Sequence, residues 1–88
     1  PTNAEWNQER RTWSSNNAEG AFASPLKLPM AGYRSDSNGS LFNVGSFGFY
    51  WCSTVSGTDA RFLRFDSGDA EMAAGPRAGG NSVRCLKD

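Results

Sequence analysis

The clearest alternation of hydrophobic and polar positions lies at residues 60–66, Ala-Arg-Phe-Leu-Arg-Phe-Asp. Successive residues of a β-strand point to opposite faces of its sheet. Leu63 and Phe65 share one face, which we expect to pack in the core. The other face, which we expect to be exposed, carries Phe62, Arg64 and Asp66. The pattern therefore predicts a strand whose outer side mixes aromatic and charged residues.

Two further segments, residues 48–54 and 81–86, are short and rich in aromatic or β-branched residues, as strands are. The Gly-containing link at residues 55–58 joins the first of them to the strand above, which predicts a hairpin. We therefore expect an antiparallel sheet of three strands. Within it, we expect Tyr50 and Trp51 to pack in the core.

The chain begins with Thr2-Asn3-Ala4-Glu5, which has the Thr-x-x-Glu form of a helix capping box. This motif predicts a helix over residues 3–11. Trp6 is its inward anchor, and Trp13 follows at or just beyond its end. The other residues of the segment are mostly polar, so we expect a surface helix with a narrow apolar stripe.

The remaining segments show no sustained period, and we expect mainly loops and turns there. In chain order, we expect a loop over residues 14–24 pinned by Phe22, a short edge strand over residues 30–34 after Pro29, a turn over residues 35–40, an irregular stretch over residues 41–47, and an irregular loop over residues 69–80 anchored by Met72. In the last predicted strand, Val83 and Cys85 point one way, and Val83 is expected to face the core.

Length and charge narrow the function classes. Eighty-eight residues make a single domain, near the lower limit of unaided folding. Nine basic and nine acidic residues give a formal net charge of zero, which argues against a nucleic-acid binder and against a partner of charged membranes. No apolar run approaches the ~20 residues of a membrane-spanning helix, so we expect no membrane insertion.

Few residues offer catalytic or metal-binding chemistry. Histidine, the commonest general base and metal ligand, is absent, and no nucleophile–base pair has a supporting spacing, so we expect no enzyme. Asp66, Asp69 and Glu71 suggest calcium, but their spacing matches no known calcium loop, and we expect no metal and no cofactor. Cys52 and Cys85 permit either one disulfide or two buried thiols.

Several segments, in order and spacing, resemble known bacterial domains. The opening residues, Pro1-Thr2-x-Ala4-Glu5-Trp6, resemble the helix start of formylglycine-generating-enzyme-like and related C-type-lectin-fold domains. The segments that resemble the Fibrobacter major paralogous domain, a family of bacterial surface domains, are Leu28-Pro29-Met30-Ala31-Gly32-Tyr33-Arg34, Gly39-Ser40-Leu41, Val44-Gly45-Ser46, Tyr50-Trp51-x-Ser53-Thr54, Ala60-Arg61 and Ser82-Val83-Arg84-Cys85. The resemblance covers essentially the whole chain.

The resemblance implies an α+β, C-type-lectin-like fold, with an N-terminal helix followed by a twisted antiparallel sheet with long irregular loops. It also implies that residues 1–88 are the C-terminal portion of a longer domain, because such domains carry a first strand and a first helix before this point. An upstream segment or a partner chain is therefore expected to complete the fold beside residues 81–86. The sugar-binding calcium motif of true C-type lectins and the cysteine pair of formylglycine-generating enzymes have no match here.

Some members of this family resemble the variable proteins of diversity-generating retroelements, in which rewritten asparagine codons alter the side chains of a ligand-binding face. The positions that interrupt the family's pattern here are Phe47, Phe49, Cys52, Phe62, Arg64, Asp66, Asp69, Ala73, Ala74, Gly75, Pro76, Gly79 and Asn81, with Asp36, Phe42 and Asp59 as further candidates. Changing the first two bases of an asparagine codon cannot yield Trp, Met, Lys, Gln or Glu, and none of these positions carries one. Glu71 lies where a varied position is expected but does not fit this rule.

The resemblance and the residues together predict a non-enzymatic ligand-binding or adhesin module with a diversified surface. Exposed aromatic and Arg side chains in one patch are typical anchors of a binding surface. For Phe47, Phe49 and Phe62 the alternative is ordinary core packing. For Arg64 and Asp66 the alternative is a solvated ion pair with no role in binding.

The expected ligand is an unidentified protein or carbohydrate. The expected location is the bacterial cell surface or another extracellular site, with a phage virion as the alternative. A different function remains open: a structural or assembly domain of a bacterial surface protein or phage tail receptor-binding protein, whose patch is buried by a neighbouring domain.

Overall fold

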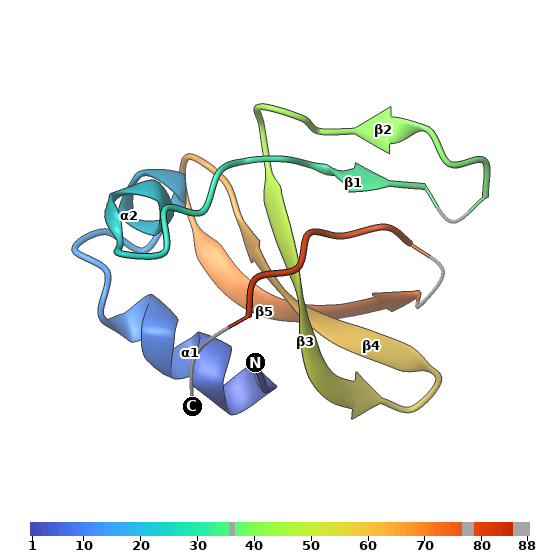
Figure 1. Cartoon of the computed structure of the whole chain (residues 1–88), viewed down its shortest axis with the longest axis horizontal. Coiled ribbons are helices and arrows are strands. Elements are labelled where there is room, and N and C mark those ends of the chain that lie inside the picture. Colours follow the sequence, from blue (N-terminus) through green and yellow to red (C-terminus); the bar gives the residue numbers. More distant parts are fainter. Residues whose placement is uncertain (36, 77–78, 86–88) are drawn as a thin grey trace.

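A computed structural model describes residues 1–35, 37–76 and 79–85 of the chain. Over these residues the chain forms a small α+β domain with two short helices and two antiparallel sheets (Figure 1). The elements are α1 (Asn3–Arg11), α2 (Ala18–Ala23), β1 (Tyr33–Arg34), β2 (Leu41–Phe42), β3 (Gly48–Ser56), β4 (Asp59–Phe65) and β5 (Ala70–Pro76). One sheet pairs β1 with β2, and the other has the order β3-β4-β5. No described helix is long and apolar enough to cross a membrane.

The predicted capping box forms at the start of α1. The Thr2 hydroxyl accepts from the Glu5 N–H at 3.1 Å, and the Glu5 carboxylate accepts from the Thr2 N–H at 2.8 Å. These bonds lower the pKa of Glu5. Trp6 is fully buried, and its indole N–H donates to the Trp51 carbonyl at 3.0 Å. The helix prediction is confirmed, and Trp13 is also buried, just beyond the helix end.

The two central strands are confirmed: β3 begins at Gly48 as predicted and ends two residues later, and β4 lies one residue earlier than predicted. β3 pairs antiparallel with β4, and Tyr50 lies opposite Leu63. The predicted hairpin closes through residues 57 and 58, where Gly57 has a φ of 61°. Glycine adopts this conformation without a steric penalty. The register shifts between Trp51 and Val55, so β3 carries a local irregularity there.

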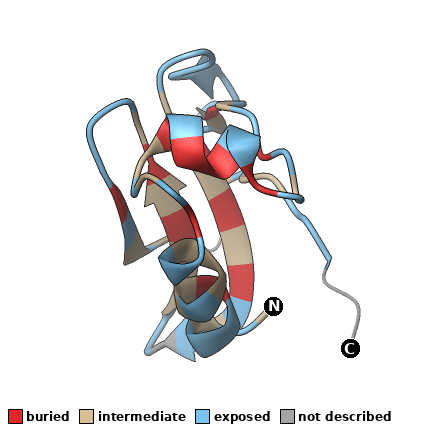
Figure 2. Cartoon of the chain, turned by 90° about the vertical axis from the view of Figure 1, so that its left-hand side faces the viewer, coloured by how far each residue is buried: buried red, intermediate tan, exposed pale blue. Residues whose placement is uncertain are grey.

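The core lies on the inner face of the three-stranded sheet, the face against which α1 packs. Its buried residues are Trp6, Trp13, Ala18, Ala21, Leu28, Tyr50, Cys52, Leu63, Phe65 and Ala70. Buried and less buried residues alternate along the strands (Figure 2). Leu63 and Phe65 face the core as predicted. The prediction for Trp51 is wrong: it is half-buried on the opposite face, because it alternates with the buried Tyr50.

The third strand of this sheet is β5, within the stretch expected to be an irregular loop. β5 pairs antiparallel with β4 over seven residues, from Asp59 opposite Pro76 to Phe65 opposite Ala70. Its Ala- and Gly-rich sequence has low intrinsic strand preference. Pairing along a neighbouring strand and burial of one face override that preference.

The prediction of residues 81–86 as the third strand of an antiparallel sheet is wrong for the described residues 81–85: they make one bridge to β3, and that bridge, Tyr50 with Ser82, is parallel. Ser82 donates its N–H to the Phe49 carbonyl at 2.9 Å and accepts from the Trp51 N–H at 3.0 Å. Val83 is 70% exposed, so its predicted inward orientation is wrong. A single bridge does not impose the pleat that would carry Val83 to the core. Residue 86 of this predicted strand lies outside the described residues.

The loop predicted over residues 14–24 contains α2. The Asn17 side chain caps this helix by accepting from the Gly20 N–H at 3.1 Å. A Cβ at Gly20 would lie 1.8 Å from the Ser15 carbonyl oxygen, so the turn packs closer than any other residue permits. The buried residues of α2 are Ala18, Gly20 and Ala21. Phe22 is 57% exposed and does not pin this segment to the core, contrary to the prediction.

β1 and β2 form a small hairpin. The strand predicted over residues 30–34 shrinks to β1, and β2 lies in the stretch expected to be irregular. The predicted turn joins them. The Gly39 N–H donates to the Ser35 carbonyl at 3.0 Å, and the Ser35 N–H donates to the Ser40 carbonyl at 2.9 Å.

Candidate functional site

The sheet face turned away from α1 carries the largest group of the predicted contact residues. We call it the outer face and define it by the residues that alternate with the core: Phe49 and Trp51 of β3, Phe62 and Arg64 of β4, and Glu71, Ala73 and Gly75 of β5. Phe47, just before β3, adjoins it. The strand register aligns these residues in rows, with Phe62 between Trp51 and Ala73.

The aromatic rings of the outer face form a continuous cluster. Phe49 stacks with Phe47, with ring centres 5.7 Å apart, and meets Phe62 edge-on at 5.6 Å. Phe62 also meets Trp51 edge-on at 5.9 Å. Tyr33 of β1 adds an edge contact to Phe49 at 5.1 Å, so the β1–β2 hairpin contributes to the cluster. The cluster is half-buried: its rings contact one another without being sealed from solvent.

A hollow of ≈ 320 Å³ opens beside this cluster. Its aromatic walls are Tyr33, Phe49, Trp51 and Phe62, and its other lining residues are Arg34, Asn43, Ala74, Gly75, Pro76, Gly79 and Asn81. At its rim the Phe62 ring packs close to the β5 backbone, because position 75 is a glycine and a Cβ there would lie 3.1 Å from the ring. The Arg34 guanidinium is the only charged group among these lining residues. The hollow therefore suits an apolar group with a polar edge.

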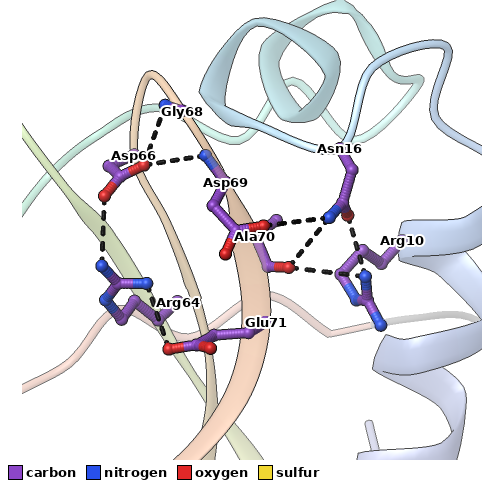
Figure 3. Close-up of polar contacts among 8 residues, drawn as sticks. All are labelled: Arg10, Asn16, Arg64, Asp66, Gly68, Asp69, Ala70 and Glu71. Atoms are coloured by element: carbon purple, nitrogen blue, oxygen red, sulfur yellow. Dashed lines mark hydrogen bonds and ion pairs between the residues drawn. The ribbon is translucent and has the colours of Figure 1, made fainter.

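Arg64 is held at the other end of the outer face by two carboxylates (Figure 3). Its guanidinium lies 3.1 Å from Asp66 and 3.2 Å from Glu71, and its centre is 4.9 Å from the Phe47 ring. The Arg64 side chain is 26% exposed, so these contacts fix its position and add little to stability.

Asp66 also organises the turn between β4 and β5. One of its carboxylate oxygens accepts from the Gly68 N–H and from the Asp69 N–H, both at 2.9 Å. These bonds, the first of them foremost, with the nearby charge of Arg64, lower the pKa of Asp66. Asp69 turns instead toward Asn16, whose amide donates to its carboxylate at 3.2 Å (Figure 3). The three acidic residues of this region are thus engaged with other side chains or amides.

The predicted site residues divide into groups. Those on or adjoining the outer face are Phe47, Phe49, Phe62, Arg64, Glu71, Ala73 and Gly75; those bordering the hollow beside it are Ala74, Pro76, Gly79 and Asn81; those in the β4–β5 turn are Asp66 and Asp69. Asp59 lies at the start of β4, opposite Pro76. Phe42 of β2 stacks on Tyr33, with ring centres 5.6 Å apart. Asp36 lies outside the described residues.

Cys52 does not belong to this surface. It is buried on the inner face, and that burial raises the pKa of its thiol. Both cysteines are free, and Cys85 is exposed, so the described structure contains neither the disulfide nor a second buried thiol. The prediction of Cys52 as a ligand contact is wrong, because Cys52 lies two residues from the buried Tyr50 in β3 and therefore on the same, inner face.

Four residues that border the hollow were not predicted as contact residues: Tyr33, Arg34, Asn43 and Trp51. Trp51 was assigned to the core, although the alternation within residues 48–54 places it opposite Tyr50 and thus outside. Tyr33 carried no signal, because its contact with Phe49 depends on how the β1–β2 hairpin folds over the sheet. The described residues contain no group of three or more His, Cys, Asp or Glu side chains arranged to hold a metal.

No protein-family model, no curated protein and no solved structure matches the chain. The likeness to the Fibrobacter major paralogous domain therefore rests on the sequence segments quoted above. The function is therefore inferred from the structure of the outer face.

Proposed function

We propose that this chain is a non-enzymatic ligand-binding module of C-type-lectin-like fold, and that the outer face is its contact surface. The observation that carries the proposal is the half-buried cluster of Phe49, Trp51 and Phe62 beside an open hollow. Aromatic anchors next to a concave apolar site are typical of binding surfaces. Arg64, fixed at the edge of the cluster by two carboxylates, has more N–H groups than these two ion pairs use, and such a group suits the carbonyl oxygen of a ligand.

We further propose that this surface is diversified by a retroelement. Six of the predicted variable positions lie on or adjoin one sheet face: Phe47, Phe49, Phe62, Arg64, Ala73 and Gly75. Side chains there can be exchanged while Leu63 and Phe65 keep the inner face packed. Such a module belongs at the tip of a bacterial surface adhesin or in a phage receptor-binding protein, where its partner is a protein or carbohydrate of another cell.

The binding proposal is tested with the double variant Phe62→Ala/Arg64→Ala. The wild-type chain is screened on a glycan array and on a panel of purified bacterial surface proteins, and each ligand found is titrated against the variant. We expect binding at least tenfold weaker. The matched control is Phe22→Ala/Arg11→Ala, which removes an exposed Phe and an exposed Arg from α2 and α1. Ligands that lose affinity for the control but not for the Phe62/Arg64 variant would refute the proposal.

The retroelement proposal has a genetic test. We expect a near-identical downstream repeat of the coding sequence, with adenines at the variable positions, beside a reverse-transcriptase gene. A single-copy coding sequence with no such repeat would remove diversification from the account and leave the binding surface to be tested by itself.

A second candidate function is that of an assembly domain. Leu41, Phe42 and Val44 are 56%, 44% and 61% exposed, and Phe42 stacks on Tyr33 at the edge of the outer face. An apolar patch of this kind also suits burial by a neighbouring domain. The variant Leu41→Ser/Val44→Ser distinguishes the two functions, because it should weaken assembly with a neighbouring domain and leave ligand affinity at the outer face unchanged.

A further inference from the structure

β5 is an outer strand of the three-stranded sheet, and its register shows which of its backbone groups point away from β4. The Asp66 N–H donates to the Asp69 carbonyl, in register with the pair Phe65 and Ala70. In an antiparallel ladder, hydrogen-bonded pairs alternate with non-bonded pairs. The residues of β5 that bond to β4 are therefore 71, 73 and 75. Those that turn their N–H and C=O groups outward are 70, 72, 74 and 76.

Both ends of this open edge are already occupied. The Ala70 carbonyl accepts from the Asn16 amide at 3.1 Å and from Arg10 at 3.4 Å (Figure 3). Pro76 has no N–H, and its carbonyl accepts from the Gly79 N–H at 3.2 Å. Between them, the N–H and C=O groups of Met72 and Ala74 have no hydrogen-bond partner among the described residues. Four backbone groups thus remain open, with the two residues ~6.6 Å apart along the strand.

The hollow lies beside the C-terminal part of β5, which includes the open groups of Ala74, since Ala74, Gly75 and Pro76 line it. The outer-face residues of β5 are Glu71, Ala73 and Gly75, and the two that follow Glu71 are small. These small side chains leave open the path from the edge of β5 to the Phe62 ring. A large side chain on an added strand can therefore reach across them, as aromatic side chains reach diagonal neighbours in sheets.

We infer that the outer face binds an extended peptide segment of a protein, which pairs with β5 at Met72 and Ala74 and inserts a large apolar side chain into the hollow. This inference rests on the proposed function and names its ligand class. Backbone pairing supplies affinity, and the hollow selects one side chain, as in other complexes formed by strand addition. Two observations favour a peptide over a sugar: the open groups repeat at the spacing of a strand, and edge-to-face rings wall the hollow instead of forming a flat platform.

The test uses a phage-displayed library of random twelve-residue peptides, selected against the whole chain. We expect the enriched peptides to share a large apolar residue within an extended stretch. Ala74→Pro removes one outward N–H and leaves the β4 ladder intact, because that N–H points away from β4. Synthetic copies of the peptides should bind this variant at least about fivefold more weakly, the effect of losing one hydrogen bond. The control Ala23→Val changes an exposed alanine of α2 that belongs neither to the edge nor to the hollow, and it should bind as the wild type does.

Two further arms keep the test independent of the folding of the Pro variant. Methylating alternate backbone nitrogens of the peptide should abolish binding to the wild-type chain. Trp51→Ala, which removes one wall of the hollow, should weaken binding about tenfold, whereas Phe22→Ala should not.

Failure to enrich any peptide, or enrichment of peptides indifferent to Ala74→Pro and to backbone methylation, would overturn the inference. So would dimers of the chain that dissociate in Ala74→Pro, since they would assign this edge to a second copy. If instead a glycan binds, and its affinity depends on Phe62 and Arg64 but not on the Ala74 N–H, the inference of a peptide ligand is refuted and the proposed function stands. If the array ligands ignore Phe62 and Arg64, the proposed function fails instead.

Discussion

The indole N–H of Trp6 donates a hydrogen bond to the main-chain carbonyl of Trp51, with 3.0 Å between the two atoms. Trp6 belongs to α1 and is fully buried, whereas Trp51 belongs to β3 and lies on the outer face. One bond thus ties the helix beneath the sheet to the strand that carries two of the aromatic walls of the hollow. It also lies where β3 begins to leave its regular register with β4.

We predict that Trp6→Phe lowers the free energy of unfolding by about 2 kcal/mol. The Trp51 carbonyl loses its donor, which costs ~1–3 kcal/mol when the group is buried, and the smaller ring leaves unfilled space. Urea unfolding followed by circular dichroism measures the loss. Trp51→Phe is the control and should cost less, because the Trp51 side chain is only half-buried and its backbone carbonyl stays in place. Equal losses in the two variants would contradict this account.

Gly20→Ala should destabilise the domain by ~2 kcal/mol or more, although alanine favours helices by ~1 kcal/mol over glycine. The added Cβ would lie 1.8 Å from the Ser15 carbonyl oxygen, so the turn before α2 has to move. The control is Gly68→Ala, where the nearest atom to the new Cβ, an Asp66 oxygen, is 3.7 Å away. Thermal unfolding of both variants provides the comparison. A Gly20→Ala variant as stable as the wild type would show that the contact is not as close as described.

Asp66 should make stability depend on pH in the acid range. Its pKa is lowered, chiefly because the Gly68 N–H binds the ionised form, with help from the Asp69 N–H and Arg64. The unfolded chain therefore takes up this proton at a higher pH than the folded chain does. The stabilisation is complete above the unfolded pKa of about 3.9 and is lost as pH falls through the lower folded pKa.

Asp66→Asn keeps an acceptor for the Gly68 and Asp69 amides but cannot titrate. Thermal unfolding between pH 7 and pH 2 should show a smaller acid-induced fall in Tm for this variant than for the wild type. Parallel curves for the two proteins below pH 4 would mean that Asp66 does not contribute to the acid dependence.

The two cysteines should react very differently. Cys85 is exposed, whereas Cys52 is buried and its pKa is raised by that burial, so its reactive thiolate is scarce. Titration with a thiol reagent at pH 8 should modify one thiol quickly and the second only after urea is added. Cys85→Ser should remove the fast reaction. Two fast thiols, or none, would contradict the burial pattern.

Amide exchange should alternate along β5. The N–H groups of Ala73 and Gly75 bond to β4 and should exchange slowly, whereas those of Met72 and Ala74 point outward and should exchange quickly. Hydrogen exchange followed by NMR resolves the four amides without any ligand. Uniform protection along the strand would mean that something already covers this edge.

Local patterns predicted the parts of the fold that depend on near neighbours. The Thr2–Glu5 capping box and the inward Trp6 identified α1, because both depend on residues within one or two helical turns. The alternation of Leu63 and Phe65 with Phe62 and Arg64 assigned the two faces of β4, since a strand has a period of two. Phe62 and Arg64 of the candidate site followed from that one pattern.

The third strand and the hollow required partners distant in sequence. β5 is a strand because β4 lies beside it. Its sequence, Ala-Glu-Met-Ala-Ala-Gly-Pro, has no pattern that predicts a strand. The hollow forms where Tyr33 folds over β3 and the Phe62 ring packs against Gly75 of β5. Short-range periodicity therefore settled which side chains of a strand share a face. The neighbours of each face were settled by long-range pairing, whose energy comes from contacts that a single stretch of chain does not contain.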